Sequence, residues 1–156
     1  MDNSPAFTID YSGTGEHIAY IEDLYDVNQA DLSAAVDAKF AAVSAHVDLA
    51  AGDGAAGQLV WTFTSASSGI VAFPVVSPAV RWKSERSDLL RFQAMAVGNG
   101  TAPGVNNKTI DYLASKKGSR FGAILYDFYG SDARLGPATL SWDLSTIPNR
   151  CAPLLS

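Results

Sequence analysis

The first half of the chain alternates between short runs of β-branched and aromatic residues and one long segment with helical spacing. Residues 18–25 and 59–64 are the short runs, and their composition predicts two strands. Asn28 is a candidate N-cap for the helix between them, and Gly52 is a candidate end. Apolar residues recur every three or four positions along that helix and so share one face: Leu32, Val36, Phe40, Val43, Val47 and Ala50. The pattern predicts a β-loop-α-loop-β unit.

The second half repeats this alternation after a long connection. Residues 74–104 are rich in proline, glycine and charge, with a short helix expected around residues 88–97. Residues 106–117 have a helical pattern that Gly118 ends, and residues 121–128 form the clearest strand pattern. Such βαβ alternation predicts parallel strands joined by right-handed crossovers. The fold class is therefore α/β, either a doubly wound sheet or a piece of a (β/α)8 barrel.

Composition narrows the class of protein. The chain has 156 residues, of which 47% are hydrophobic and 17% charged, as expected for one globular domain. Eleven basic and sixteen acidic side chains leave a net charge of −5, so nucleic acid is not an expected partner. A single cysteine, Cys151, excludes an intrachain disulfide framework and a cysteine-based zinc cage. We expect no metal and no cofactor.

No apolar run is long enough to span a bilayer, since a spanning helix needs about 20 residues. The first residues, Met-Asp-Asn-Ser-Pro, have neither the basic nor the apolar region of a secretory signal, so none is expected in the sequence as written. Localisation stays open.

Polar residues lie where the predicted parallel strands end, and ligands bind at that edge of such sheets. Asp23 and Tyr25 lie at the end of the first predicted strand, serines 65 and 67 at the end of the second, and Asp127 followed by Tyr129 at the end of the third. The alternative interpretation is that each acid caps the loop or helix that follows it.

Four short motifs carry a family resemblance. They are Glu-Asp-Leu-Tyr at 22–25, Phe-Thr-Ser-Ala-Ser at 63–67, Gly-Val-Asn at 104–106 and Tyr-Asp-Phe-Tyr at 126–129. In this order, residues 18–129 resemble the C-terminal half of the bacterial-type phosphatidylinositol-specific phospholipase C catalytic domain, which also occurs in fungi. The resemblance implies parallel βα units forming a partial (β/α)8, TIM-like barrel. It also implies cleavage of the phosphodiester of phosphatidylinositol, with two histidines as general base and general acid.

The resemblance assigns roles to three residues. Asp23 corresponds to the acid that hydrogen-bonds inositol hydroxyls, and Tyr25 to the aromatic ring that stacks on the inositol. Asp127 corresponds to the carboxylate that supports a catalytic histidine. These residue types suit the chemistry, since a polyol needs fixed acceptors and an apolar plate, and an imidazole needs an orienting carboxylate.

The catalytic histidines of the family lie in the other half of its barrel, and this sequence contains only His17 and His46. His17 begins the first strand, roughly 20 Å from its carboxyl end. His46 lies in mid-helix beside the apolar stripe, where a boundary position near solvent is expected. We therefore expect the isolated chain to be inactive, or nearly so, toward phosphatidylinositol. The alternatives are a non-catalytic remnant that binds inositol or phospholipid, and an interaction protein that uses its sheet edge.

Length supports a single incomplete domain over residues 1–156, because a complete (β/α)8 barrel takes about 250 residues. Residues 130–156 do not clearly follow the family pattern. An incomplete barrel leaves sheet edges unpaired, which predicts a homodimer through an exposed edge. The run Arg-Trp-Lys-Ser-Glu-Arg at 81–86 combines an aromatic with cations, as in peripheral membrane contacts, although an ordinary solvated loop is the simpler interpretation.

Overall fold

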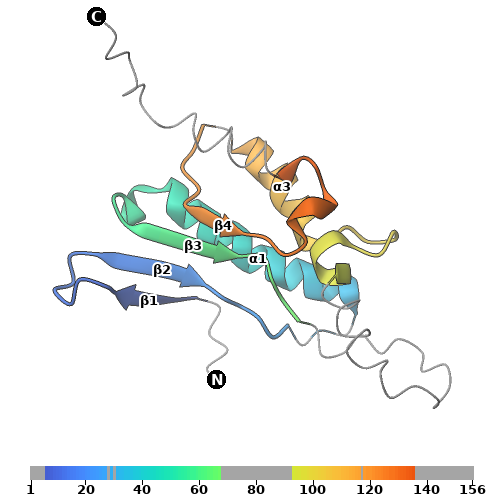
Figure 1. Cartoon of the computed structure of the whole chain (residues 1–156), viewed down its shortest axis with the longest axis horizontal. Helices are drawn as coiled ribbons and strands as arrows, with labels where there is room; N and C mark the ends of the chain where they lie inside the picture. The colour runs from blue at the N-terminus through green and yellow to red at the C-terminus, as the bar shows by residue number, and fades with distance from the viewer. Residues whose placement is uncertain (1–5, 28, 30, 68–92, 117, 136–156) are drawn as a thin grey trace, which may run out of the picture.

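The computed structural model describes residues 6–27, 29, 31–67, 93–116 and 118–135, which form a four-stranded sheet with helices (Figure 1). Its elements follow in chain order: β1 (Ala6–Asp10), β2 (Ile18–Glu22), α1 (Leu32–Ala51), the 3₁₀ turn η1 (Asp53–Ala55), β3 (Leu59–Phe63), α3 (Val105–Ser115), β4 (Ala123–Leu125) and the 3₁₀ turn η2 (Tyr129–Ser131). Residues 93–97 are also helical. The expected positions 28, 81–86 and 88–92 lie outside the described residues.

The sheet has the order β1-β2-β3-β4 and is mixed. β2, β3 and β4 run parallel, so the expectation of parallel βα units is confirmed for them. The sequence reading missed β1, which pairs antiparallel with β2. The turn between them is held by the carboxylate of Asp10, which accepts hydrogen bonds from the backbone N–H groups of Ser12, Gly13 and Gly15. This connection over residues 11–17 brings β1 back beside β2, so the fold is α/β with a mixed sheet.

Several predicted boundaries were wrong. The first predicted strand ends at Glu22 instead of residue 25, and the last is shortened to Ala123–Leu125. α1 begins at Leu32 because Asp31 caps it, its carboxylate accepting the N–H of Ala34 at 2.8 Å. Gly52 does end the helix, as predicted.

One face of the sheet, the covered face, packs against α1. The main core contains α1 residues and residues of the second half of the chain, and Ile124 of β4 packs against it. Its fully buried members include Val36, Val43, Val47, Val105, Leu113 and Phe121. α1 passes behind β3 and β4 in Figure 1, and α3 packs beside α1. The helices thus shield a single side of the sheet.

The opposite side, which we call the open face, is apolar. Strand register places these residues on it: Phe7, Ile9, Ala19, Ile21, Leu59, Trp61, Phe63, Ala123 and Leu125. Ala19 and Ile21 are buried between neighbouring strands, whereas Trp61 on the interior strand β3 is still 39% exposed. In residues 59–64, which the sequence predicts as a strand, only the alternate residues Val60, Thr62 and Thr64 are buried.

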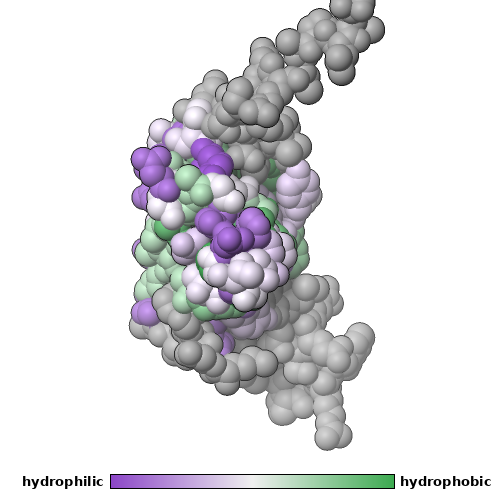
Figure 2. Space-filling view, turned by 90° about the vertical axis from the view of Figure 1, so that its left-hand side faces the viewer, coloured by the Kyte–Doolittle hydropathy of each residue, from purple (hydrophilic) through white to green (hydrophobic). Residues whose placement is uncertain are grey.

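The two ends of the sheet differ in character. Figure 2 looks onto the end where β2 and β3 begin, and hydrophilic residues gather there beside apolar ones. The candidate residues lie at the other end, where these strands finish. Among the described residues, no helix is both long enough and apolar enough to span a membrane.

Candidate functional site

The carboxyl ends of β2 and β3 are tied together beyond the strands themselves. The N–H of Val27 donates to the carbonyl of Ser67 at 2.9 Å, and the N–H of Ser67 donates to the carbonyl of Tyr25 at 2.7 Å. These bonds form an isolated parallel bridge between residues 26 and 67. Tyr25 therefore lies on a segment with a fixed backbone, and Ser67 contributes to the site by that backbone pairing.

Tyr25 lies at the same edge of the sheet as Asp23 and Asp127, the two acidic residues that the sequence analysis named with it. Its side chain is 44% exposed, and burial of the remainder raises the pKa of its phenol above the ordinary value. The negative charges of Asp127, Asp26 and Asp23 raise that pKa further, because a nearby negative charge disfavours the phenolate. The structure thus brings Asp23, Tyr25 and Asp127 to the same edge of the sheet. Asp26 is an addition that the sequence reading did not select.

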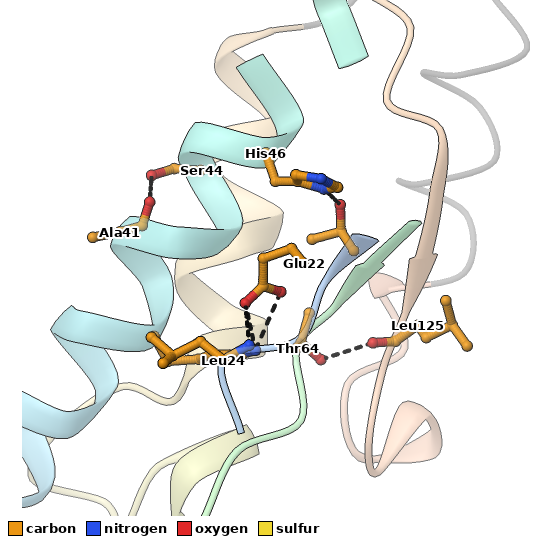
Figure 3. Close-up of polar contacts among 9 residues, drawn as sticks. Glu22, Leu24, Ala41, Ser44, His46, Thr64 and Leu125 are labelled. Atoms are coloured by element: carbon orange, nitrogen blue, oxygen red, sulfur yellow. Dashed lines mark hydrogen bonds and ion pairs between the residues drawn. The ribbon is translucent and has the colours of Figure 1, made fainter. Parts of the chain in front are cut away.

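Beneath this edge lies a buried ion pair between the sheet and α1. The Nζ of Lys39 donates to the two carboxylate oxygens of Glu22 at 2.9 and 3.2 Å, and the side chains are 0% and 1% exposed (Figure 3). Burial lowers the pKa of Lys39, and the charge of Glu22 opposes that change. Glu22 also accepts the N–H of Leu24 at 2.9 Å. The pair therefore fixes the chain where it leaves β2 toward Asp23 and Tyr25.

Asn106, at the start of α3, connects the ends of β3 and β4. Its Oδ1 accepts the hydroxyl of Thr64 at 3.0 Å, and its Nδ2 donates to the carbonyl of Asp127 at 2.8 Å. The Thr64 hydroxyl also lies 3.2 Å from the carbonyl of Leu125 (Figure 3). Asn106 is 1% exposed, and its amide joins the Thr64 side chain to the backbone at Asp127.

The sequence contained a signal for Lys39 that was not used. Lys39 follows Val36 by three positions and precedes Val43 by four, so it falls on the apolar stripe of α1. A cation at such a position needs a buried partner. Asn106 was part of a quoted motif, but no sequence feature identified its partners.

His46 does not occupy the boundary position that we expected. It is 5% exposed, and its Nδ1 shares a hydrogen bond of 2.9 Å with the hydroxyl of Thr62 on β3. Its Nε2 is buried without a hydrogen-bond partner. The prediction of a histidine near solvent was wrong because this side of α1 packs against the covered face of the sheet, which buries the His46 side chain.

Neither histidine contacts Asp127 in the part of the chain that the structure describes. His17 lies in the turn between β1 and β2, where its ring stacks on Tyr11 with centroids 5.6 Å apart. His46 bonds to Thr62, the residue before the last of β3, on the covered face of the sheet. The residues described around Tyr25 therefore offer carboxylates and a phenol but no imidazole.

We predict that stability falls as pH decreases below neutral because of His46. Burial, followed by the nearby charge of Lys39, lowers the pKa of His46 below its ordinary value of about 6.5. The unfolded chain therefore takes up this proton first, so the stabilisation is complete above about pH 6.5 and is lost as pH falls toward the folded-state pKa. Urea unfolding between about pH 7.5 and 5.5 should show a loss of up to about 1.4 kcal/mol per pH unit. His46→Gln should flatten the profile, whereas His17→Gln should keep it; a flat wild-type profile would contradict the prediction.

These features define a mixed α/β protein with acidic and aromatic residues at the carboxyl edge of its parallel strands. No family model matches the chain, and no curated protein matches it in sequence. Solved structures of the phosphatidylinositol-specific phospholipase C of Staphylococcus aureus have a similar fold. A double mutant matches with a TM-score of 0.56, a structure concerned with modulation of its membrane binding with 0.55, and a form containing pentafluorophenylalanine with 0.54.

In each of these three matches the sequence identity is 17%, and the alignment covers 85% of this chain. The same alignments cover 33% of the phospholipase chain, so this chain spans about a third of the length of the proteins it resembles. The similarity is one of fold, and it extends over most of the present sequence.

The described residues contain no group of three or more histidine, cysteine, aspartate or glutamate side chains arranged to hold a metal ion.

Proposed function

We propose that this chain is the inositol-binding part of a phosphatidylinositol-specific phospholipase C-like domain, a phosphoric diester hydrolase or lyase family that acts on phosphatidylinositol-type lipids. In this proposal residues 1–156 form a single incomplete domain, and the sheet is part of a (β/α)8-type barrel. The supporting features are the consecutive parallel strands β2, β3 and β4, the helices on one face, and the similarity of fold. The antiparallel β1 departs from that barrel pattern.

The observation that supports the proposal is that Tyr25, Asp23 and Asp127 all follow the carboxyl ends of parallel strands in one sheet, where the charges of both aspartates raise the pKa of the Tyr25 phenol. A polyol ring presents C–H groups on its face and hydroxyl groups at its rim. An exposed aromatic ring can stack on the face, while carboxylates accept hydrogen bonds from the hydroxyls. Because Tyr25 and Asp127 are held through backbone bonds to Ser67 and Asn106, the acceptors would be in place before the ligand arrives.

Catalysis is not expected from the isolated chain. Cleavage of the phosphodiester with the inositol 2-hydroxyl as nucleophile needs one group to take a proton from that hydroxyl and another to protonate the leaving oxygen. The imidazole of His46 is committed to Thr62, and that of His17 stacks on Tyr11. With no imidazole to orient, Asp127 would serve here as a hydrogen-bond acceptor for the ligand.

We predict that the purified chain binds myo-inositol and that Tyr25→Ala weakens binding at least about tenfold, since the loss of an aromatic stacking partner costs on the order of 1.5 kcal/mol. Titration by NMR would measure the affinity. Tyr11→Ala is the matched control, because Tyr11 is also exposed but lies in the turn between β1 and β2. Absence of inositol binding by the wild-type chain would overturn the proposal.

Turnover of phosphatidylinositol vesicles separates the enzyme from the alternative, a non-catalytic remnant that binds inositol or phospholipid. Release of cyclic inositol phosphate by the wild-type chain, abolished in Asp127→Asn, would contradict the expected inactivity. Inositol binding without turnover would favour the binding remnant. Co-sedimentation with the same vesicles would test peripheral membrane contact, for which residues 81–86, outside the described part of the chain, are the candidates.

A further inference from the structure

The open face of the sheet has a composition that a solvated surface seldom has. Every residue that strand register places on it is apolar, from Phe7 on β1 to Leu125 on β4. Five of these side chains are large and remain between 37% and 46% exposed: Phe7, Ile9, Leu59, Trp61 and Leu125. Contiguous exposed apolar surface of this kind marks an interaction site.

We propose that the open face packs against the open face of a second copy of this chain. A two-fold axis brings the same patch of each protomer together, so the patch must be complementary to itself. The open face meets this condition, because the strand residues that the structure describes on it carry no charge that would be desolvated or would repel its symmetry mate. Twisted sheets pack face to face in this way, about 10 Å apart.

The exposed apolar side chains of the open face supply roughly half of the area that a standard dimer interface buries per partner. With about 150–250 Å² for each large side chain, the exposed fractions of the five residues sum to roughly 400 Å². A standard interface buries about 800 Å² per partner, and the core of a homodimer interface is its most apolar part. The five side chains would thus supply the core, with the backbone, the partly buried Phe63 and the small Ala123 extending it.

A second copy suits this face better than a lipid surface or an edge-to-edge contact. Membrane-binding surfaces combine apolar residues with lysine or arginine. The described cations lie elsewhere: Lys39 and Lys108 on the helices, Lys116 directly after α3, and Arg120 and Arg134 in loops. A dimer through the edge of β1 or β4, as the sequence suggested, would leave Trp61 on interior strand β3 uncovered. Contact between the open faces would bury it.

Sedimentation equilibrium of the full chain over ~1–100 µM tests the proposal by mass action. The expected mass rises with concentration toward twice 16.4 kDa. Trp61→Glu should weaken the dimer at least about a hundredfold, because it places a charge in the centre of the contact. Ala45→Glu introduces the same charge at an exposed position of α1 and should leave the dimer unchanged.

Several outcomes would overturn the proposal: a wild-type chain that stays monomeric, one that forms only large aggregates, or a dimer that tolerates Trp61→Glu as well as Ala45→Glu does. The last result would indicate an edge contact. Circular dichroism of Trp61→Glu establishes that it is folded, and the milder Leu59→Gln on the same strand replaces it if it is not. The test does not depend on inositol binding, which is measured separately at Tyr25.

Discussion

Replacement of Lys39 by methionine is expected to destabilise the chain by about 3–5 kcal/mol, because it leaves the carboxylate of Glu22 buried without its cation. Glu22 is 1% exposed, and Lys39 supplies both hydrogen bonds of the pair. Methionine has nearly the same length and fills the same space, so the loss reflects charge rather than a cavity. Urea unfolding at pH 7 measures the effect.

Two further variants separate the pair from general damage to the core. The double variant Glu22→Gln with Lys39→Met should recover most of the lost stability, since both charges are removed and the glutamine oxygen can still accept the N–H of Leu24. Lys116→Met, a change in the partly exposed pair with Asp48, should have a much smaller effect. If the double variant is no more stable than Lys39→Met alone, the uncompensated charge is not the cause.

The expected loss has a consequence for the candidate site. Glu22 is the last residue of β2, and Asp23 and Tyr25 follow it directly. Without the cation, the carboxylate of Glu22 gains stability by moving toward water, and the chain that leaves the strand must move with it. The buried ion pair therefore contributes to the geometry around Tyr25 although it does not reach the surface.

Local sequence patterns were sufficient for the order of β2, α1, β3, α3 and β4, because period and composition reflect which side of each element is buried. They also predicted that Tyr25 and Asp127 lie at the same edge of the sheet, since parallel strands in one sheet bring their carboxyl ends to one edge. The antiparallel β1 was missed although Phe7 and Ile9 alternate with the polar residues Thr8 and Asp10, a strand pattern that was not used. Its place in the fold depends on the turn at Asp10.

The position of a polar residue on a helix did not predict whether its side chain is buried. Lys39 and His46 both lie next to apolar positions of α1, and each is buried only because a partner on the sheet receives it: Glu22 for the lysine and Thr62 for the histidine. Those partners lie on the strands β2 and β3, and the spacing of residues within α1 does not indicate them. The same holds for Asn106, whose two partners lie on either side of it in the sequence.

Replacement of Asn106 by leucine is expected to cost about 2–4 kcal/mol, because it removes two buried hydrogen bonds and leaves the Asp127 carbonyl without the amide that it accepts from. Thr64→Val is the matched comparison. It removes the hydroxyl that donates to Asn106 but keeps the bond from Asn106 to Asp127, so its expected cost is smaller, about 1–2 kcal/mol. Urea unfolding gives both values.

The two variants should differ more clearly in local order than in global stability. Asn106→Leu frees the backbone that follows β4, so amide hydrogen exchange at residues 126–129 should become at least about tenfold faster than in the wild-type chain. Thr64→Val should leave exchange at these residues near the wild-type rate, once both are compared at equal global stability. Equal acceleration in the two variants would show that Asn106 stabilises the fold in general and does not hold Asp127 in particular. Faster exchange confined to Asn106→Leu would make this asparagine a positioning residue for the carboxylate, since the backbone bond at Asp127 fixes where its side chain leaves the sheet.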